Sequence, residues 1–380
     1  MVSDRVFTDP AGAELVSLVA DFAAAEVAPT AAQGDKDGKL DRDLYRRLGE
    51  LGLFGLPYPE DFGGMAQPYE TYLQALEELA AARVSVAFGV SIHVMTCQPV
   101  FKFGTDKQRE DFLPEMIGGD KLGAYALSEP DAGSDVASMR TKAVREGDEY
   151  VLNGTKCWIS NASGADYFTL FARTGPGSSG ISCFLVPGGL DGLTVGQPEH
   201  KMGLHDSPTC PVTFENVRIP AGNLIGAEGD GLKIALSSLD SGRLGIAACA
   251  TGLAQAALDH AVQYAGEREQ FGQAISTFQG MQFMLAEMAA KVDISRAMYL
   301  HAARKRDAGL DFTRDAAVAK LTASDNAMSV TTDAVQVLGG YGYTQDFPVE
   351  RMMREAKITQ IFEGTNQIQR LVIARKLLRA

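Results

Sequence analysis

The chain has 380 residues, of which 46% are hydrophobic, and its mean hydropathy of −0.05 is typical of an ordinary globular protein. Its formal net charge of −13 at pH 7 argues against nucleic acid or an anionic membrane surface as a general partner. This length is enough for two or three domains with sizeable hydrophobic cores.

Cysteine usage and the first ten residues bear on the cellular compartment. The five cysteines lie far apart and include no CxxC pair, which indicates neither a zinc site nor a disulfide framework. They are typical of buried thiols in a reducing compartment. Residues 1–10 lack the apolar core of a signal peptide and the Arg-rich character of a transit peptide. No apolar run approaches the length of a membrane span, so we expect a cytoplasmic protein without membrane insertion.

The first third of the chain has a helical pattern. Apolar residues recur at spacings of three and four over Ala13–Phe22, and a second helix is expected from the capping residue Asp41 to Leu48. The segment 69–96 changes from amphipathic to almost wholly apolar, which predicts a helix that enters the interior. A loop rich in proline and glycine separates these segments at residues 55–64. We expect an N-terminal helical domain over residues 1–120.

After Gly118 and Gly119 the pattern changes to the alternation typical of strands. The segment 150–159 contains Asn153-Gly154, a pair that predicts a tight hairpin turn between two strands. Further strands are expected over 167–172, 181–186 and 212–219. No helical pattern separates them, which favours an antiparallel sandwich or barrel over a parallel nucleotide-binding sheet. We assign this central β domain to residues 121–228.

Long helical segments return from Gly231 onward. Helices are expected over residues 232–266, 279–308, 312–338 and 365–378, with short connections that predict an antiparallel bundle. This third domain covers residues 229–380. The order α, then β, then α predicts an α+β fold.

One carboxylate stands out in the segment 357–370. Ile361 and Phe362 precede Glu363, Gly364 permits an unusual backbone angle, and Thr365 or Asn366 can cap the following helix. On its own, a Glu-Gly pair is more often a solvated turn. A helix N-terminus lowers the pKa of a nearby carboxyl group, whereas apolar surroundings raise it. We therefore hypothesise a base that strengthens when an apolar substrate excludes water.

Four other motifs each allow a structural and a functional interpretation. The glycine run 338–343 lacks GxGxxG spacing, so it is either a helix end with glycine caps or a place where a ligand approaches the backbone. The segment 125–135 is an inter-domain loop or a cradle for a heteroaromatic ring. Trp158 is core or a flat wall for a stacked ring. Arg268 with Phe271 is a solvated helix end or a phosphate clamp. The five histidines form no metal-binding pattern.

Taken together, these motifs resemble the acyl-CoA dehydrogenase family. The segments 125–135, 158–160, 268–272, 336–340 and 361–370 occur in the family's order and intervals, and the resemblance covers nearly the whole chain. It implies an N-terminal helical domain, a central antiparallel β domain and a C-terminal four-helix bundle. It also implies FAD as cofactor and a homotetramer, with a dimer as the alternative.

The resemblance assigns roles to individual residues by position. Glu363 matches the catalytic base, and Phe88, Ser91, Met95 and Phe362 border the expected acyl pocket. Ser128 and Ser160 stand where the family commonly has threonine, and some FAD contacts are expected across a subunit interface. The residues expected to line the acyl-CoA are Ser134, Asp240, Arg243 and Gly364. Those expected to bind FAD are Tyr125, Leu127, Ser128, Gly133, Ser134, Trp158, Ile159, Ser160, Arg268, Phe271, Phe278, Gln279, Gln336, Gly339, Gly340, Thr365 and Gln367.

The implied reaction is the α,β-dehydrogenation of an acyl-CoA to a trans-2-enoyl-CoA. Glu363 would remove the pro-R α-proton while the β-hydride passes to flavin N5, and electrons would then pass to an electron-transferring flavoprotein. Some family members place the base near Gly242, which here carries no acid, and Val86 argues against a dicarboxylic substrate. The alternatives are an acyl-CoA oxidase, a dehydrogenase of carrier-protein thioesters, and a non-enzymatic acyl-CoA-binding scaffold.

Overall fold

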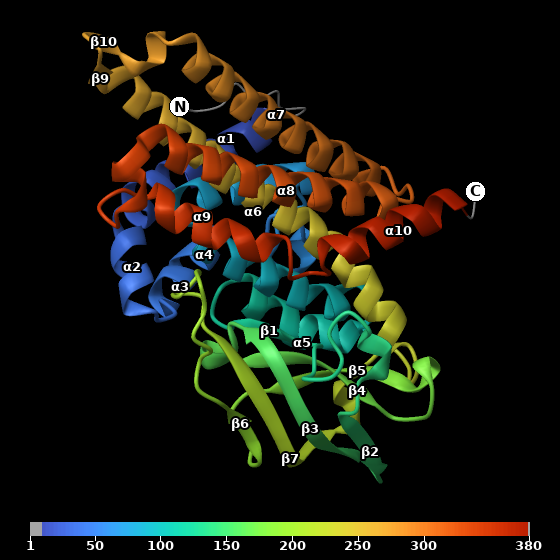
Figure 1. Ribbon diagram of the computed structural model, residues 1–380. Coiled ribbons are helices and arrows are strands. Elements are labelled where there is room, and N and C mark those ends of the chain that lie inside the picture. The colour runs from blue at the N-terminus through green and yellow to red at the C-terminus, as the bar shows by residue number, and fades with distance from the viewer. Residues whose placement is uncertain (1–9, 379–380) are drawn as a thin grey trace.

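Helices from both ends of the chain pack together above one central sheet in the computed structural model, which describes residues 10–378 (Figure 1). The expected order of helices, strands and helices is confirmed. The N-terminal helices are α1 (Pro10–Phe22), α2 (Ala31–Asp37), α3 (Arg42–Glu50), α4 (Tyr69–Phe103) and α5 (Asp106–Ile117).

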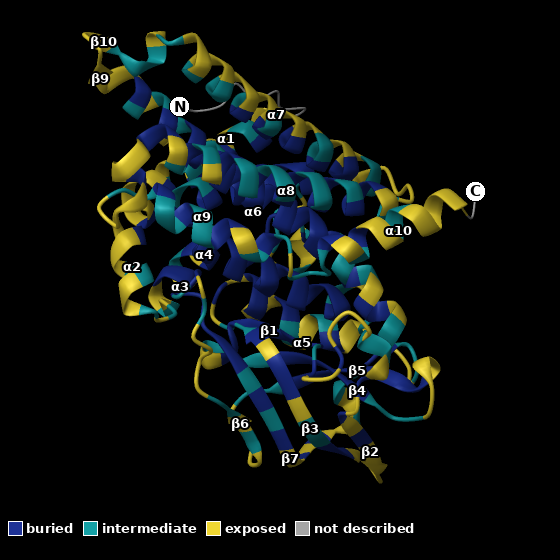
Figure 2. Cartoon of the chain, in the orientation of Figure 1, coloured by how far each residue is buried: buried dark blue, intermediate teal, exposed yellow. Residues whose placement is uncertain are grey.

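Two of these helices follow directly from their sequence signals. Asp41 caps α3, because its side chain accepts a hydrogen bond from the Leu44 amide at 3.0 Å. Helix α4 is buried along most of its length, as its apolar second half predicts (Figure 2). Its helical geometry breaks once, at Arg83, whose φ of −162° and ψ of 98° are extended. The helix therefore has two arms that meet at a buried arginine.

The central sheet has eight strands in the order β6-β7-β3-β2-β4-β5-β8, with β1 paired to β4. Most neighbours are antiparallel as expected, but β1 and β2 each run parallel to β4. Their side chains enclose a second hydrophobic core, separate from the one shared by the helices. The strands are β1 (Gly123–Ala126), β2 (Lys142–Glu146), β3 (Glu149–Ser160), β4 (Tyr167–Arg173), β5 (Ile181–Pro187), β6 (Leu193–Val195), β7 (Thr209–Pro220) and β8 (Leu224–Ile225).

The hairpin turn expected at Asn153-Gly154 is wrong. Both residues lie inside β3, which pairs with β7 on both sides of a register shift between Leu152 and Gly154. The Asn153 side chain accepts a hydrogen bond from the Asn216 amide at 2.9 Å, so the pair forms a bulge. The turn lies instead at Gly147, which has a φ of 64° and joins β2 to β3.

The expected C-terminal helices are confirmed, and one helix was not foreseen. Helix α9 precedes Glu363, and a short hairpin (β9 with β10) follows α6 at one end of the bundle (Figure 1). The elements are α6 (Gly231–Glu267), β9 (Glu269–Gln270), β10 (Gln273–Ala274), α7 (Gln279–Asp307), α8 (Thr313–Leu338), α9 (Val349–Thr359) and α10 (Asn366–Leu378). The domain boundaries after residues 120 and 228 stay a prediction.

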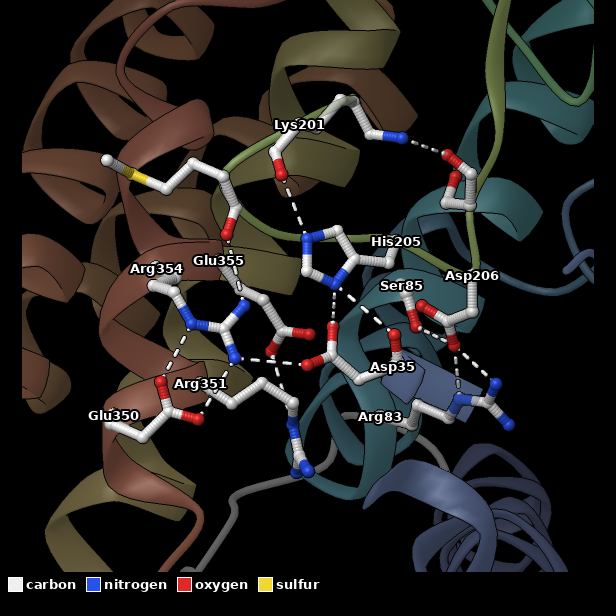
Figure 3. Close-up of polar contacts among 12 residues, drawn as sticks. Asp35, Arg83, Ser85, Lys201, His205, Asp206, Glu350, Arg351, Arg354 and Glu355 are labelled. Atoms are coloured by element: carbon white, nitrogen blue, oxygen red, sulfur yellow. Dashed lines mark hydrogen bonds and ion pairs between the residues drawn. The ribbon is translucent and has the colours of Figure 1, made fainter. Parts of the chain in front are cut away.

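A polar junction fixes α9 against the rest of the chain (Figure 3). Arg354 of α9 donates a hydrogen bond of 3.0 Å to Asp35 of α2, and His205 Nδ1 lies 2.8 Å from the same carboxylate. Arg83, at the break in α4, donates a hydrogen bond of 2.6 Å to the Asp206 carboxylate. Because His205 and Asp206 both precede β7, the junction joins α9, the N-terminal helices and the sheet.

Two helical stretches have the length and apolar character to cross a membrane, contrary to the expectation that none approaches it. They are Pro10–Asp37 and Tyr69–Phe103. In the second, 89% of the apolar window is buried inside the protein, which is typical of a core helix. The first lies near the N-terminus and is 28% buried.

Candidate active site

Glu363 lies in the turn between α9 and α10, and its backbone is in the left-handed region. Its φ is 53°, and that of Gly364 is 85°. Thr365 caps α10, because its hydroxyl accepts a hydrogen bond from the Ile368 amide at 3.2 Å. The expected glycine turn and helix cap are confirmed, but the positive φ of Glu363 itself was not expected. A left-handed non-glycine residue is strained by about 1 kcal/mol and marks a functional candidate.

The Glu363 side chain extends to α6. A Cβ added at Gly242 of α6 would lie 2.8 Å from Glu363 Oε2 and 2.7 Å from Met95 Sδ of α4. The adjacent Phe362 ring stacks on Phe88 with centroids 4.4 Å apart. Of the residues expected at the acyl pocket, Met95 approaches the same point of α6 as the carboxylate, and Phe88 stacks on the residue before Glu363.

The Glu363 carboxyl group has an unusual electrostatic environment. Its Oε2 is enclosed and has no hydrogen-bond partner among the described residues, although the residue as a whole is partly exposed. Burial raises its pKa to about 7, against the opposing charges of Arg243 and Lys320. A carboxylate with that pKa is suited to accept a proton near neutral pH.

Asp240 and Arg243, both expected near the substrate, form an ion pair on α6. The Asp240 carboxylate also accepts a hydrogen bond from Thr313 at 2.7 Å, and its pKa is raised by burial. Arg243 is buried, and its Nε has no partner among the described residues. The pair joins α6 to the start of α8 and presents an unsatisfied donor in the neighbourhood of Glu363.

The loop after β1 is held to β3 by a buried lysine. Lys156 Nζ donates hydrogen bonds of 2.9 Å to the Leu127 carbonyl and 2.8 Å to Glu129, and the Cys157 amide donates to the Ser128 carbonyl. A register shift between Lys156 and Ile159 turns Trp158 outward, with a φ of 61° and 62% of its surface exposed. Trp158 is thus not core, which favours the interpretation as a flat wall.

Other residues of the predicted flavin set surround this loop and the Glu363 turn. Tyr125 is buried at the end of β1, and Glu363 acts electrostatically on its hydroxyl group, as it does on that of Tyr69. A Cβ at Gly133 would meet no atom within 4 Å, so a ligand can approach this backbone. The partly buried or exposed members of this set are Ser128, Gly133, Ser134, Trp158, Ser160, Thr365 and Gln367.

A second part of the predicted FAD set lies at the other end of the bundle. A cavity of about 470 Å³ is lined by Arg268, Gly339, Gly340 and the ring of Tyr341, which lies 5.9 Å from the Arg268 guanidinium. Gly339 caps α8 with a φ of 59°, and added Cβ atoms at both glycines would face open space. Phe271, in the β9–β10 turn, is 94% exposed. Phe278, Gln279 and Gln336 come from the adjoining ends of α7 and α8.

Within one chain, the predicted FAD residues near Trp158 and those near Arg268 lie far apart. The β9–β10 hairpin lies at the opposite end of the molecule from the sheet that carries Trp158 (Figure 1). Trp158 thus belongs to the sheet, whereas Arg268 and Gly339 line the cavity near the hairpin.

Sequence reasoning missed Lys320, which lies on α8 in the neighbourhood of Glu363. It is completely buried, and burial lowers its pKa to about 7. The available signal was its spacing, because Lys320 shares the 3.6-residue period of the buried alanines 316, 323 and 327. A lysine in the middle of an alanine face is either paired or functional.

The chain matches models of three domains of one protein family, in the same order as the helical, β and helical parts of the structure. Three family models match: "Acyl-CoA dehydrogenase, N-terminal domain" over residues 10–120, "middle domain" over 124–217 and "C-terminal domain" over 229–378. An acyl-CoA dehydrogenase of Clostridium acetobutylicum, described as short-chain specific, is 43% identical over 96% of this chain and 98% of its own length.

Two solved structures superpose closely. The butyryl-CoA dehydrogenase of Megasphaera elsdenii has a TM-score of 0.97 at 43% identity, covering 99% of this chain and all of that one. A chain from a structure described as the electron transferring flavoprotein of Acidaminococcus fermentans has a TM-score of 0.97 at 44% identity, with the same coverage.

Proposed function

The chain belongs to the acyl-CoA dehydrogenase family of flavoprotein oxidoreductases, and from this we propose that it oxidises an acyl-CoA thioester to the trans-2-enoyl-CoA, with Glu363 as the base. One observation carries the assignment of the base. Glu363 Oε2 is enclosed, has no partner among the described residues and belongs to a carboxyl group whose pKa is raised to about 7. A merely structural carboxylate in such a position would be paired.

The residues around Glu363 support abstraction of a proton. Apolar side chains of Met95, Phe88 and Phe362 lie near the carboxylate, and its Oε2 is enclosed, which limits the access of water to the base. Thioester α-protons are weakly acidic, so the site must also stabilise charge that develops on the carbonyl oxygen. We assign one donor for this oxygen to the backbone N–H of Glu363.

We propose FAD as the cofactor, which supplies the hydride acceptor when it is bound. The residues present fit it: an exposed indole at Trp158, open backbone at Gly133, and a cavity bordered by Arg268 and two glycines that suits a pyrophosphate-containing group. Trp158 is carried by the sheet and Arg268 directly precedes the β9–β10 hairpin, and these two elements lie at opposite ends of the molecule (Figure 1). We therefore propose that a second copy of the chain completes each FAD site, in a homotetramer or dimer.

We further propose a short-chain acyl-CoA as substrate and an electron-transferring flavoprotein as acceptor, in the cytoplasm. The similarity to proteins described as short-chain specific and as butyryl-CoA dehydrogenase supports the first, and the structure that carries the flavoprotein description supports the second. The packing agrees with a short pocket, because a Cβ at Gly245 of α6 would collide with Ser91 of α4 one turn beyond Gly242.

Anaerobic titration of the flavin-loaded protein with butyryl-CoA, longer acyl-CoAs and a carrier-protein thioester tests this function. Bleaching of the flavin band by butyryl-CoA is expected, and Glu363→Gln should slow it by about 10³-fold or more. Glu355→Gln is the matched control, since Glu355 is also buried and its pKa is raised to about 8, yet it faces the junction of Figure 3.

Three outcomes would redirect the assignment. Bleaching by the carrier-protein thioester alone would transfer the function to that substrate class, and rapid reoxidation by oxygen would favour an oxidase. A purified protein that binds no FAD would favour an acyl-CoA-binding scaffold.

A further inference from the structure

Helix α8 presents a polar face to the turn that carries Glu363. Lys320 Nζ donates hydrogen bonds of 2.9 Å to the Gly364 carbonyl and 2.9 Å to the Asn366 side-chain oxygen. Ser324, one turn further along α8, donates to the same Asn366 oxygen at 3.1 Å. Asp325 accepts hydrogen bonds of 2.7 Å from both Asn366 and Gln360. The turn is therefore held at its beginning, middle and end by one helix.

This turn needs such an anchor because its backbone is strained. Glu363 and Gly364 are both left-handed, and their carbonyl groups point inward to accept hydrogen bonds from the Gln369 side chain at 3.2 and 2.8 Å. A strained backbone persists only where its surroundings over-determine it. Lys320 and Gln369 together give the Gly364 carbonyl two donors, from α8 and α10.

A lysine is an unfavourable choice if the position only needs filling. Lys320 is completely buried, and a buried ammonium group loses its hydration. Its hydrogen bonds go to a backbone carbonyl and an amide rather than to a carboxylate. A methionine would fill a similar volume without the free-energy cost of removing an ammonium group from water. The positive charge of Lys320 therefore needs a reason beyond packing.

We propose that Lys320 is a positioning residue for the base, whose ammonium group fixes the Glu363–Gly364 turn on α8 and favours the ionised form of the Glu363 carboxylate in its enclosed site. This proposal rests on the proposed function, because it takes Glu363 as the base. Lys320 contacts neither substrate nor cofactor in this role and acts through Glu363.

Other charged and titratable groups also face Glu363, and Lys320 is set apart by its hydrogen bond to the Gly364 carbonyl of the turn. Arg243 faces Glu363 from α6, lowers the pKa of that carboxyl group more than Lys320 does, and also forms an ion pair with Asp240. The neutral phenols of Tyr69 and Tyr125 face it from α4 and β1. Asp325, on α8, acts on Lys320 and raises the lysine's pKa, as Glu363 itself does, against the effect of burial. Two carboxylates therefore favour the charged form of the lysine.

Lys320→Met tests the proposal, with Lys305→Met as the matched control. Lys305 also contacts α8, through an ion pair with Asp315 near the start of that helix, but it lies away from the turn. In Lys320→Met, flavin reduction by butyryl-CoA should slow at least about tenfold. The pH at which reduction is half-maximal should rise by about one unit, because a cation that favours the charged carboxylate is gone. The control should leave both unchanged.

Hydrogen exchange of the flavin-loaded proteins without substrate gives a readout that needs no activity. The Asn366 amide donates to the Gln360 carbonyl at 3.0 Å across the turn. Peptides covering residues 360–370 should exchange at least about tenfold faster in Lys320→Met and at the original rate in Lys305→Met. Lys320→Gln is a second variant that keeps a donor without the charge, and it should shift the pH profile while the exchange changes less.

The two proposals fail in different ways. If no acyl-CoA bleaches the wild-type flavin, the proposed function is wrong, and the exchange experiment still decides whether Lys320 anchors the turn. If the wild type is active but Lys320→Met keeps both its pH profile and its exchange rate, the positioning role is wrong. Failure of both Lys320 variants to fold would also overturn it, because the lysine would then support the bundle and not the base in particular.

Discussion

A single methyl group added at Gly242 should disable the site. The new Cβ would lie 2.8 Å from Glu363 Oε2, 3.4 Å from Glu363 Cδ and 2.7 Å from Met95 Sδ. Ordinary contacts between such atoms are about 3.4–4 Å, so the carboxylate or α6 must move by roughly half an ångström. The flexible Met95 side chain can yield, whereas Glu363 belongs to the strained turn anchored on α8.

Two opposing terms set the stability of Gly242→Ala. Alanine in place of helical glycine stabilises by about 0.5–1 kcal/mol, whereas overpacking a buried site costs about 1–3 kcal/mol. A net loss of about 1 kcal/mol is expected. The effect on rate should be larger, because a base displaced by a fraction of an ångström loses about ten- to a hundredfold in proton abstraction.

Stopped-flow reduction by butyryl-CoA and urea unfolding measure both quantities. Gly266→Ala is the matched control, since it lies on the same helix and its Cβ would meet no atom within 4 Å. The control should be as active as the wild type and slightly more stable. A Gly242→Ala protein that reduces its flavin at the wild-type rate would refute the placement of the carboxylate against α6.

Three further predictions concern charge and backbone. The kcat/KM for reduction should fall about tenfold per pH unit below pH 7 and level off above it, since the base must be ionised and its pKa is about 7; a flat profile from pH 5 to 8 would contradict this. The pKa of Glu355 is raised by burial from 4.5 to about 8, so the folded protein holds this proton more tightly and loses stability as the pH rises between those values. Glu355→Gln should reduce that loss in urea unfolding at pH 5.5 and 8. Gly364→Ala places a Cβ at a φ of 85° and 2.9 Å from the Gln369 side chain, so it should lower stability by about 1 kcal/mol and slow reduction; unchanged unfolding would argue against a strained turn.

Sequence signals predicted helices and helix caps well where the stabilising interactions lie within a few residues of the signal. Asp41, Thr365 and the glycine at 339 cap helices within a few residues of themselves, and the long amphipathic helices follow from periodicity. Asn153-Gly154 failed for the opposite reason. Its turn preference is overridden by β7, a twelve-residue partner strand that pairs with β3 on both sides of the bulge. The parallel pairing of β1 with β4 is likewise a contact between distant segments.

The sequence predicted the individual motifs of the candidate site, but it did not predict which distant residues come into contact there. Glu363, Trp158 and Arg268 were found because each stands in a recognisable short pattern. Lys320 carries no such pattern, and its contact with Gly364 spans 44 residues of sequence. Gly242 and Glu363 are separated by still more residues of sequence. Neither contact produces a periodic pattern of apolar residues that could be recognised in the sequence. The residues that tune the base are therefore the ones that only the fold identifies.

The direction of the Glu363 pKa shift follows from where the side chain points. A carboxylate next to a helix N-terminus is expected to be held ionised by the free amide groups and the dipole. In this turn, however, the Thr365 hydroxyl already occupies the Ile368 amide, and Glu363 Oε2 is directed at Gly242 on α6. Burial outweighs the charges of Arg243 and Lys320 before any substrate is present and brings the pKa of Glu363 to about 7. A bound acyl chain would add to a shift that the fold has already established, so the pKa of Glu363 should rise further, but only modestly, when a non-reacting acyl-CoA analogue binds.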